Sequence, residues 1–188
     1  MDRIGPFRLR PRRLSTFQSL TQAVIHQQLN GMAAAAILAR FQRLFGNHAF
    51  PKPEEVLQVP LRLLATAGLS RAKAGCILDI AQRAVSGELP SFERCHVMTD
   101  ADLINQLTKI KGIGRWTAEM LLIFNLGRPD VLPVNDLGVR RGFQVVYGKR
   151  KLPEPEQLES FGAGWVPHRT TAAWYLWRAA DFLRDGEW

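Results

Sequence analysis

The sequence predicts an all-α fold, and three observations support this prediction. Strand-like alternation of apolar and polar residues is scarce along the 188 residues. Long segments instead repeat apolar residues at the spacing of a helix, as in MAAAAILARFQRLF at 32–45. Glycines and prolines separate these segments at short intervals. We therefore expect one helical protein with short connections.

Glycines and prolines bound the expected helices of the first half. Ser15 or Thr16 can cap the first helix, in which Phe17, Leu20 and Val24 share one face. Later breaks fall at Gly31, Gly46, the prolines of 51–60, Gly68 and Gly87. The first helix is expected to end near 26–31, and a short helix is expected between the prolines of 51–60. The other expected helices are 32–45, 61–67 and 71–85.

The second half continues this pattern after LPSFERCHVM at 89–98, which is predicted to be irregular. Thr99 and Asp102 have capping-box-like spacing, and Pro167 opens the last helix. The expected helices are 103–110, 116–126, 136–148, 153–162 and 167–183. We predict a single domain over 1–188, with two small helical lobes and a cleft between them. The middle helices, about 30–127, would form one lobe, and 1–29 plus 128–188 the other.

The charge of the chain favours a polyanionic partner. The net charge is +8 and the pI is about 10.2, which is typical of nucleic-acid-binding proteins, although a basic protein without such a partner is an alternative. Apolar runs are too short to span a bilayer, so no membrane partner is expected. Cys76 and Cys95 have no metal-binding or redox spacing, which favours a reducing, intracellular location.

The stretch LTKIKGIGRWTAEMLL, at 107–122, places two glycines between two expected helices. Gly112 and Gly114 permit backbone conformations that a Cβ opposes. Lys109, Lys111 and Arg115 surround the start of the second helix, whose unpaired N–H groups favour an anion. These five residues suit a DNA phosphate. An ordinary tight turn between helices is the alternative.

Four stretches together resemble the DNA glycosylase superfamily. LTKIKGIGRWTAEMLL resembles its helix-hairpin-helix, and VLPVNDLGVRRGF resembles its Gly/Pro-rich loop with an aspartate. LTQAVIHQQLNGMAAAAILARF and AWYLWRAADF resemble its early helix pair and its final helix. The resemblance runs from about Leu14 onward and is strongest to the DNA-3-methyladenine glycosylase II branch, in its compact form without an N-terminal β domain. It implies the helix-hairpin-helix DNA glycosylase fold.

The resemblance puts Asp136 at the catalytic position. An aspartate at the front of a helix is commonly an N-cap, and the two roles are compatible. A carboxylate there can stabilise positive charge on the deoxyribose or activate a water molecule. The other aspartates considered do not match the motif; they are Asp130, Asp181 and Asp185.

Aromatic residues are expected to line the base pocket. Aligned through the glycines, Trp116 occupies the position of the lysine nucleophile in the lyase branch that includes endonuclease III. Tryptophan forms no Schiff base, but it can stack on a flipped, cationic purine. Trp177 matches a second pocket aromatic, and Met120 can line the floor. Core packing is the alternative for both tryptophans.

The segment HQQLNG, at 26–31, resembles the one from which superfamily members insert a plug into DNA. Gln28 takes the matching position, and Asn30 can touch the minor groove. Leu69 and Ser70 can wedge the opposite strand. Solvated or capping roles for Gln27 and Gln28 are the alternative.

Metal and cofactor sites leave little signal in the side chains. No cofactor is expected, although relatives can bind Na⁺ or K⁺ through hairpin carbonyls, here those of Thr108, Ile110 and Ile113. The histidines lack metal-ligand spacing; they are His26, His48, His96 and His168. The basic segments 7–13 and 149–151 either touch phosphates or are solvated.

These expectations combine into a monofunctional glycosylase of base excision repair. Its partner would be duplex DNA with alkylated bases, bound by a monomer. Its location would be the bacterial cytoplasm, with the nucleoid, or the nucleus. A non-catalytic lesion-binding protein and a bifunctional glycosylase/lyase are the alternatives, and the preferred lesion stays open.

Overall fold

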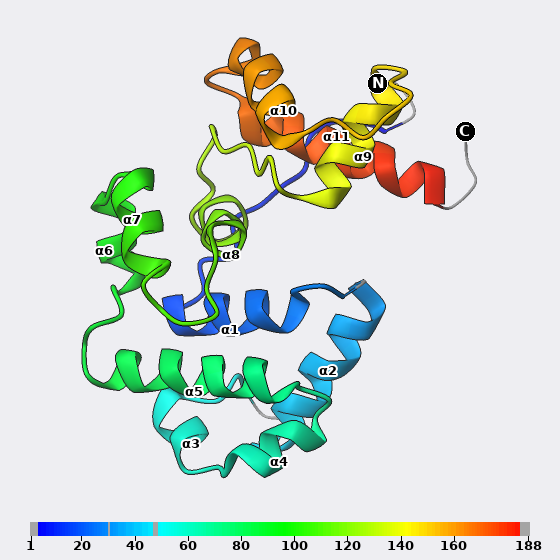
Figure 1. Ribbon diagram of the computed structural model, residues 1–188. Coiled ribbons are helices and arrows are strands. Elements are labelled where there is room, and N and C mark those ends of the chain that lie inside the picture. The colour runs from blue at the N-terminus through cyan, green and yellow to red at the C-terminus, as the bar shows by residue number, and fades with distance from the viewer. Residues whose placement is uncertain (1–3, 30, 47–48, 185–188) are drawn as a thin grey trace. The chain divides into compact units, whose positions relative to one another are not determined.

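The computed structural model describes residues 4–29, 31–46 and 49–184, and all regular elements in these ranges are helical (Figure 1). The all-α prediction is therefore confirmed. The chain divides into two compact units. Unit 1 comprises Met1–Arg12 and Leu122–Trp188, and unit 2 comprises Arg13–Leu121. Among the helices of the described ranges, none has both the length and the apolar character needed to cross a bilayer.

Unit 2 contains eight helices in its described part. They are α1 (Thr16–His26), α2 (Gly31–Arg43), α3 (Pro53–Leu57), α4 (Leu61–Thr66), α5 (Arg71–Val85), α6 (Phe92–Val97), α7 (Asp100–Leu107) and α8 (Arg115–Met120). Hydroxyl caps begin several of them: the side chains of Ser15, Ser70 and Thr99 each accept a hydrogen bond from a backbone N–H three residues later.

The core of unit 2 lies between α1 and α5, which run side by side (Figure 1). Leu20, Val24 and Ile25 of α1 and Ile77 and Ile80 of α5 are fully buried. Their burial, rather than helix propensity, accounts for most of the stability of such short helices. This apolar face assigns α1 to unit 2, whereas the expected boundary placed residues 1–29 with the C-terminal segment.

Residues 89–98 were predicted to be irregular, and this prediction was wrong. They contain α6, whose first turn is capped by Ser91: its Oγ accepts from the N–H of Arg94 at 3.2 Å. The helix has only six residues, too few for an apolar period to show. The serine directly after Pro90 was the signal that could have revealed it.

Unit 1 contains the remaining elements. They are η1 (Leu121–Leu126), α9 (Leu137–Val146), α10 (Pro155–Gly162), η2 (Ala163–Trp165) and α11 (Arg169–Arg184). Element η1 is a π-helix whose first residue, Leu121, is the last residue of unit 2. Element η2 is a 3₁₀ turn. The expected single helix 116–126 is thus α-helical only to Met120. The change of helix type was hidden because LLIF is apolar on all sides and shows no period.

Helices α9 and α11 pack directly on each other (Figure 1). A Cβ at Gly142 of α9 would overlap the backbone carbonyl of Leu176 in α11, so only glycine permits this approach. The core beside this contact consists of Leu132, Val139, Phe143, Leu158, Ala173 and Leu176. It fixes the end of α9 that begins with Asp136.

The N-terminal segment from residue 4 to 12 packs on the other elements of unit 1. The N–H of Arg12 donates to the carbonyl of Phe124 at 2.9 Å. The hydroxyl of Tyr175 donates to the carbonyl of Gly5 at 3.2 Å, and the rings of Phe7 and Trp174 meet edge to face. This segment is therefore part of a folded unit, while the side chains of Arg8, Arg10 and Arg12 remain exposed.

Candidate functional site

The carboxylate of Asp136 is held at the start of α9 by two hydrogen bonds. Its Oδ1 accepts from the backbone N–H of Val139 at 2.8 Å, which makes Asp136 the N-cap. The same oxygen accepts from the indole N–H of Trp177 in α11, also at 2.8 Å. The two donors come from different helices, so they fix the orientation of the carboxylate as well as its position.

Close packing lets the indole of Trp177 reach this carboxylate. A Cβ at Gly138 would lie 2.9 Å from Cδ1 of Trp177. On the other side, the ring of Phe124 lies 5.4 Å from that of Trp177, at an interplanar angle of 30°. Trp177 was predicted to stack on the base, and the structure shows a further role for it as a hydrogen-bond donor to Asp136.

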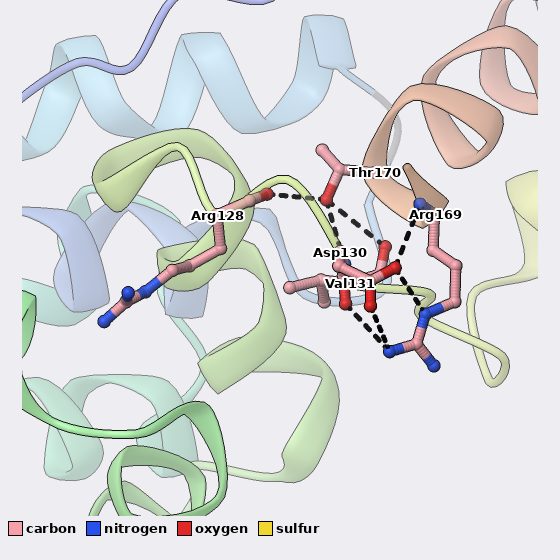
Figure 2. Close-up of polar contacts among 5 residues, drawn as sticks. All are labelled: Arg128, Asp130, Val131, Arg169 and Thr170. Carbon is pink, nitrogen blue, oxygen red and sulfur yellow. Dashed lines mark hydrogen bonds and ion pairs between the residues drawn. The ribbon is translucent and has the colours of Figure 1, made fainter. Parts of the chain in front are cut away.

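The link that leads to Asp136 is anchored at its start by an ion pair, shown in Figure 2. Arg169, the first residue of α11, donates from Nε and Nη2 to the two carboxylate oxygens of Asp130 at 2.7 and 2.8 Å. The hydrogen bonds from the Arg169 side chain hold the pKa of Asp130 below its ordinary value. Asp130 is thus committed to a structural pair.

Thr170 ties the same stretch to α11 a second time (Figure 2). Its hydroxyl donates to the carbonyl of Arg128 at 2.6 Å and accepts from the N–H of Val131 at 3.0 Å. Helix α11 therefore holds both ends of the link, Asp130 through Arg169 and Asp136 through Trp177. Of the other aspartates, Asp181 lies within α11 near Arg178, and Asp185 lies outside the described residues.

The glycine hairpin lies in unit 2 between α7 and α8. Gly112 has a φ of +91°, and a Cβ on it would lie 2.9 Å from Sγ of Cys76 in α5. Both facts require glycine at this position. Gly114 is the N-cap of α8, with an extended backbone and open space where a Cβ would be. Burial raises the pKa of the Cys76 thiol to about 11, so this thiol is a packing group at neutral pH.

The cationic residues of the hairpin differ in their surroundings. Lys109 and Lys111 are exposed, and their contact with a phosphate stays a prediction. Arg115 is exposed too, but its Nε lies 2.8 Å from Oε1 of the buried Glu119. Part of its charge is therefore already compensated within α8.

The pocket residues predicted from the sequence fall in both units. Trp116, partly buried, and Met120, buried, belong to α8 in unit 2. Asp136 and Trp177 belong to unit 1. The structure thus brings Asp136 and Trp177 into contact, and the stacking role of Trp116 stays a prediction.

The plug segment follows α1. Gln28 is exposed and has a φ of +57°, an uncommon conformation for a residue with a side chain. Asn30 lies outside the described residues. Leu69 is only 4% exposed, so it would have to leave the core to wedge into the opposite DNA strand. Ser70 caps α5 through its hydroxyl, so it too has a structural role in this conformation.

The carbonyls proposed for a cation lie in the hairpin. The carbonyl of Ile110 accepts a hydrogen bond from the N–H of Ile113 at 3.0 Å, which leaves it one lone pair. Within the described residues no three His, Cys, Asp or Glu side chains cluster in a way that could hold a metal ion. His48 lies outside these residues.

Residues 21–168 match the model of the HhH-GPD superfamily of base excision DNA repair proteins. The chain belongs to this superfamily. An HhH-GPD relative, DNA-3-methyladenine glycosylase 1 of Schizosaccharomyces pombe, is 40% identical over 171 residues, which cover 89% of this chain and 75% of the relative. The expected helix-hairpin-helix glycosylase fold is thereby confirmed.

Two solved HhH-GPD structures are similar over nearly the whole chain. One is the 3-methyladenine DNA glycosylase of Schizosaccharomyces pombe in complex with abasic DNA, with a TM-score of 0.90 and 37% identity, covering 94% of this chain and 89% of that one. The other is a DNA-3-methyladenine glycosidase of Bacillus halodurans, with a TM-score of 0.80 and 38% identity, covering 95% of this chain and 81% of that one.

Several long-range contacts within the two units were not predicted from the sequence. Arg169, Thr170, Gln27 and Lys73 make contacts between segments 39 to 90 residues apart in the chain. No periodicity or local spacing carries such a signal. A local hint of the contacts made by Thr170 was the pair of threonines at 170–171, directly at the start of a helix.

Proposed function

We propose that this chain is a monofunctional DNA glycosylase that flips alkylated purines, of the 3-methyladenine and 7-methylguanine type, out of duplex DNA and hydrolyses their N-glycosidic bonds. The observation that carries the proposal is the similarity to the 3-methyladenine DNA glycosylase bound to abasic DNA, at a TM-score of 0.90 and 37% identity. Abasic DNA is the product that base removal leaves.

The chemistry assigned to Asp136 rests on its position in the family motif, and the fixed orientation of its carboxylate supports it. As the glycosidic bond breaks, its electron pair goes to the departing base, whose positive charge is thereby neutralised. Positive charge then grows on the deoxyribose, and an oriented carboxylate stabilises it. The oxygen of a water molecule bonds to the anomeric carbon and releases a proton, which Asp136 can accept. The products are a free base and an abasic site, and no cofactor takes part.

We assign recognition of the base to Trp116, Met120 and Trp177. An alkylated purine is a cation with two flat faces, and an indole ring attracts both the charge and the face. A cationic base also leaves readily, so a single carboxylate suffices. Because Trp116 stands where the lyase branch has its lysine, no Schiff base forms and the abasic strand stays intact.

The remaining predicted residues are assigned to the DNA backbone and the gap in the duplex. The exposed hairpin, with Lys109 and Lys111, would bind phosphates, and a monovalent cation on the hairpin carbonyls would support this contact. Gln28 and Asn30 would fill and border the space of the flipped base. We propose that the protein acts as a monomer wherever the chromosome lies, in the bacterial cytoplasm or the nucleus.

Mass spectrometry of the bases released from methylated duplex DNA tests the function. We expect 3-methyladenine and 7-methylguanine in the supernatant with wild-type protein, and release close to that of DNA without protein with Asp136→Asn. DNA binding without release by the wild type would favour the non-catalytic alternative. A covalent protein–DNA adduct trapped by borohydride would favour the bifunctional one.

A further inference from the structure

We propose that Gln27 is a positioning residue that couples the hairpin to the plug residue Gln28. The inference rests on the proposed function, because it assigns Gln28 to the gap that a flipped base leaves. Gln27 would hold the turn bearing Gln28 against the hairpin. The distance between the hairpin, which binds phosphates, and Gln28, which inserts into the duplex, would then be fixed. All residues of this arrangement lie in unit 2.

The side-chain amide of Gln27 bridges two parts of the helix-hairpin-helix. Its Nε2 donates to the carbonyl of Gly112 at 3.1 Å and to Oγ1 of Thr117 at 2.9 Å. Gly112 is the left-handed glycine of the hairpin, and Thr117 is a buried residue in the first turns of α8. The two acceptors are 85 and 90 residues away in the chain. Solvation or simple capping does not explain a bridge of this kind.

The backbone of Gln27 is held as well. Gln27 is the C-cap of α1, and its carbonyl accepts from Nζ of Lys73 at 2.7 Å. The same ammonium group donates to the carbonyl of Ile25 at 2.9 Å. A cation at the C-terminus of a helix is favourable and satisfies carbonyls that the helix leaves open. Both the backbone and the side chain of Gln27 are thus fixed.

Helix α5 supplies both supports of this arrangement. Lys73 holds the end of α1, and Cys76, one turn later, packs against Gly112 of the hairpin. The turn and the hairpin are therefore fixed to one rigid helix as well as to each other. A displacement of the hairpin would strain the bridge made by Gln27.

The conformation of Gln28 makes it sensitive to this bridge. Its φ of +57° is left-handed, so the chain departs from the conformation of α1 at Gln28, whose side chain is exposed. A residue with a side chain prefers other conformations, so the neighbours must hold it there. Without the bridge, the turn would relax toward ordinary conformations and the Gln28 side chain would lose its direction.

Gln27→Met tests the inference, because it keeps the length of the side chain and removes the amide. We expect single-turnover excision from paired duplex to fall about fivefold to thirtyfold, the worth of one or two net hydrogen bonds. Excision of a mispaired target should fall less. In the background of Gln28→Ala, the same change should have little further effect, since the residue it positions is gone.

Gln18→Met is the matched control, because Gln18 is a partly buried residue of α1 whose side chain makes no hydrogen bond with a described residue. Thr117→Val removes one acceptor and leaves Gln27 in place, so it should reproduce part of the effect. Losses from Gln27→Met and Gln28→Ala that simply multiply would overturn the inference, and so would equal losses on paired and mispaired targets.

A readout without chemistry separates this inference from the proposed function. Duplex DNA with 2-aminopurine beside the target base fluoresces more strongly when that base leaves the stack. We expect Gln27→Met to reduce this signal at saturating protein, with an unchanged melting temperature. If the wild type released no base but Gln27→Met still lost the signal, only the enzymatic proposal would fail. An unchanged signal would refute the coupling.

Discussion

Trp177 donates its indole N–H to Oδ1 of Asp136 across 2.8 Å, from the middle of α11 to the N-cap of α9. The first turn of α9 donates to the same oxygen. The orientation of the carboxylate therefore depends on a helix that begins 33 positions later in the sequence, at Arg169.

Trp177→Phe should slow excision about tenfold and leave DNA binding unchanged. The smaller phenyl ring can still pack on Phe124, but it has no N–H donor; a hydrogen bond to a charged group contributes about 1.5–3 kcal/mol. Single-turnover rates and binding to an abasic duplex would be measured. Trp174→Phe is the control, since Trp174 lies on the same helix but packs on Phe7. Equal rates for both variants would contradict a role for the N–H.

Asp136→Asn should reduce excision at least about a hundredfold, the usual effect of removing a group that transfers protons. The fold should change little, because asparagine is also a good N-cap. Base release and thermal unfolding would be followed on the same preparation. A variant that unfolds early, or that excises at the wild-type rate, would mean that Asp136 is a cap and no more.

Gly112→Ala should weaken binding to normal and lesion-containing duplex alike. A Cβ at a φ of +91° is strained and would press on Cys76. Phosphate contacts carry no sequence information, so the loss should not depend on the lesion. Binding curves at several salt concentrations would show the loss. Gly114→Ala, at an open and extended position, should melt as the wild type does, whereas the strained Gly112→Ala should melt earlier. A loss confined to lesion DNA would exclude the phosphate role.

Asp130→Asn should flatten the acid dependence of stability. The pKa of Asp130 is lower in the folded state than in the unfolded chain, because Arg169 donates to its carboxylate. This stabilisation is therefore present above the unfolded pKa, near 4, and is lost as the pH falls through the lower folded value. Melting temperatures of wild type and variant between pH 6 and 3 should converge on the acid side. Parallel curves would contradict the prediction.

Local sequence signals predicted most of the helices. The features that these signals did not predict depend on tertiary contacts. Serine, threonine and Asp136 were visible as caps because a cap acts on the next three residues. The bridge made by Gln27, the anchor made by Arg169 and the packing of Phe7 on Trp174 involve residues far apart in the chain. Trp177 was recognised as part of the site from its helix, but its bond to Asp136 required the pairing of α9 with α11.

The division of the chain has a consequence for the order of its folding during synthesis. Unit 2 is continuous, so all its partners exist once Leu121 has been made. The segment from residue 4 to 12 instead contacts Phe124, Trp174 and Tyr175 and must wait for them. The ribosome thus releases a complete hairpin before the carboxylate site can form. A chain that stops before α11 would retain the hairpin and lose the anchors of Asp136.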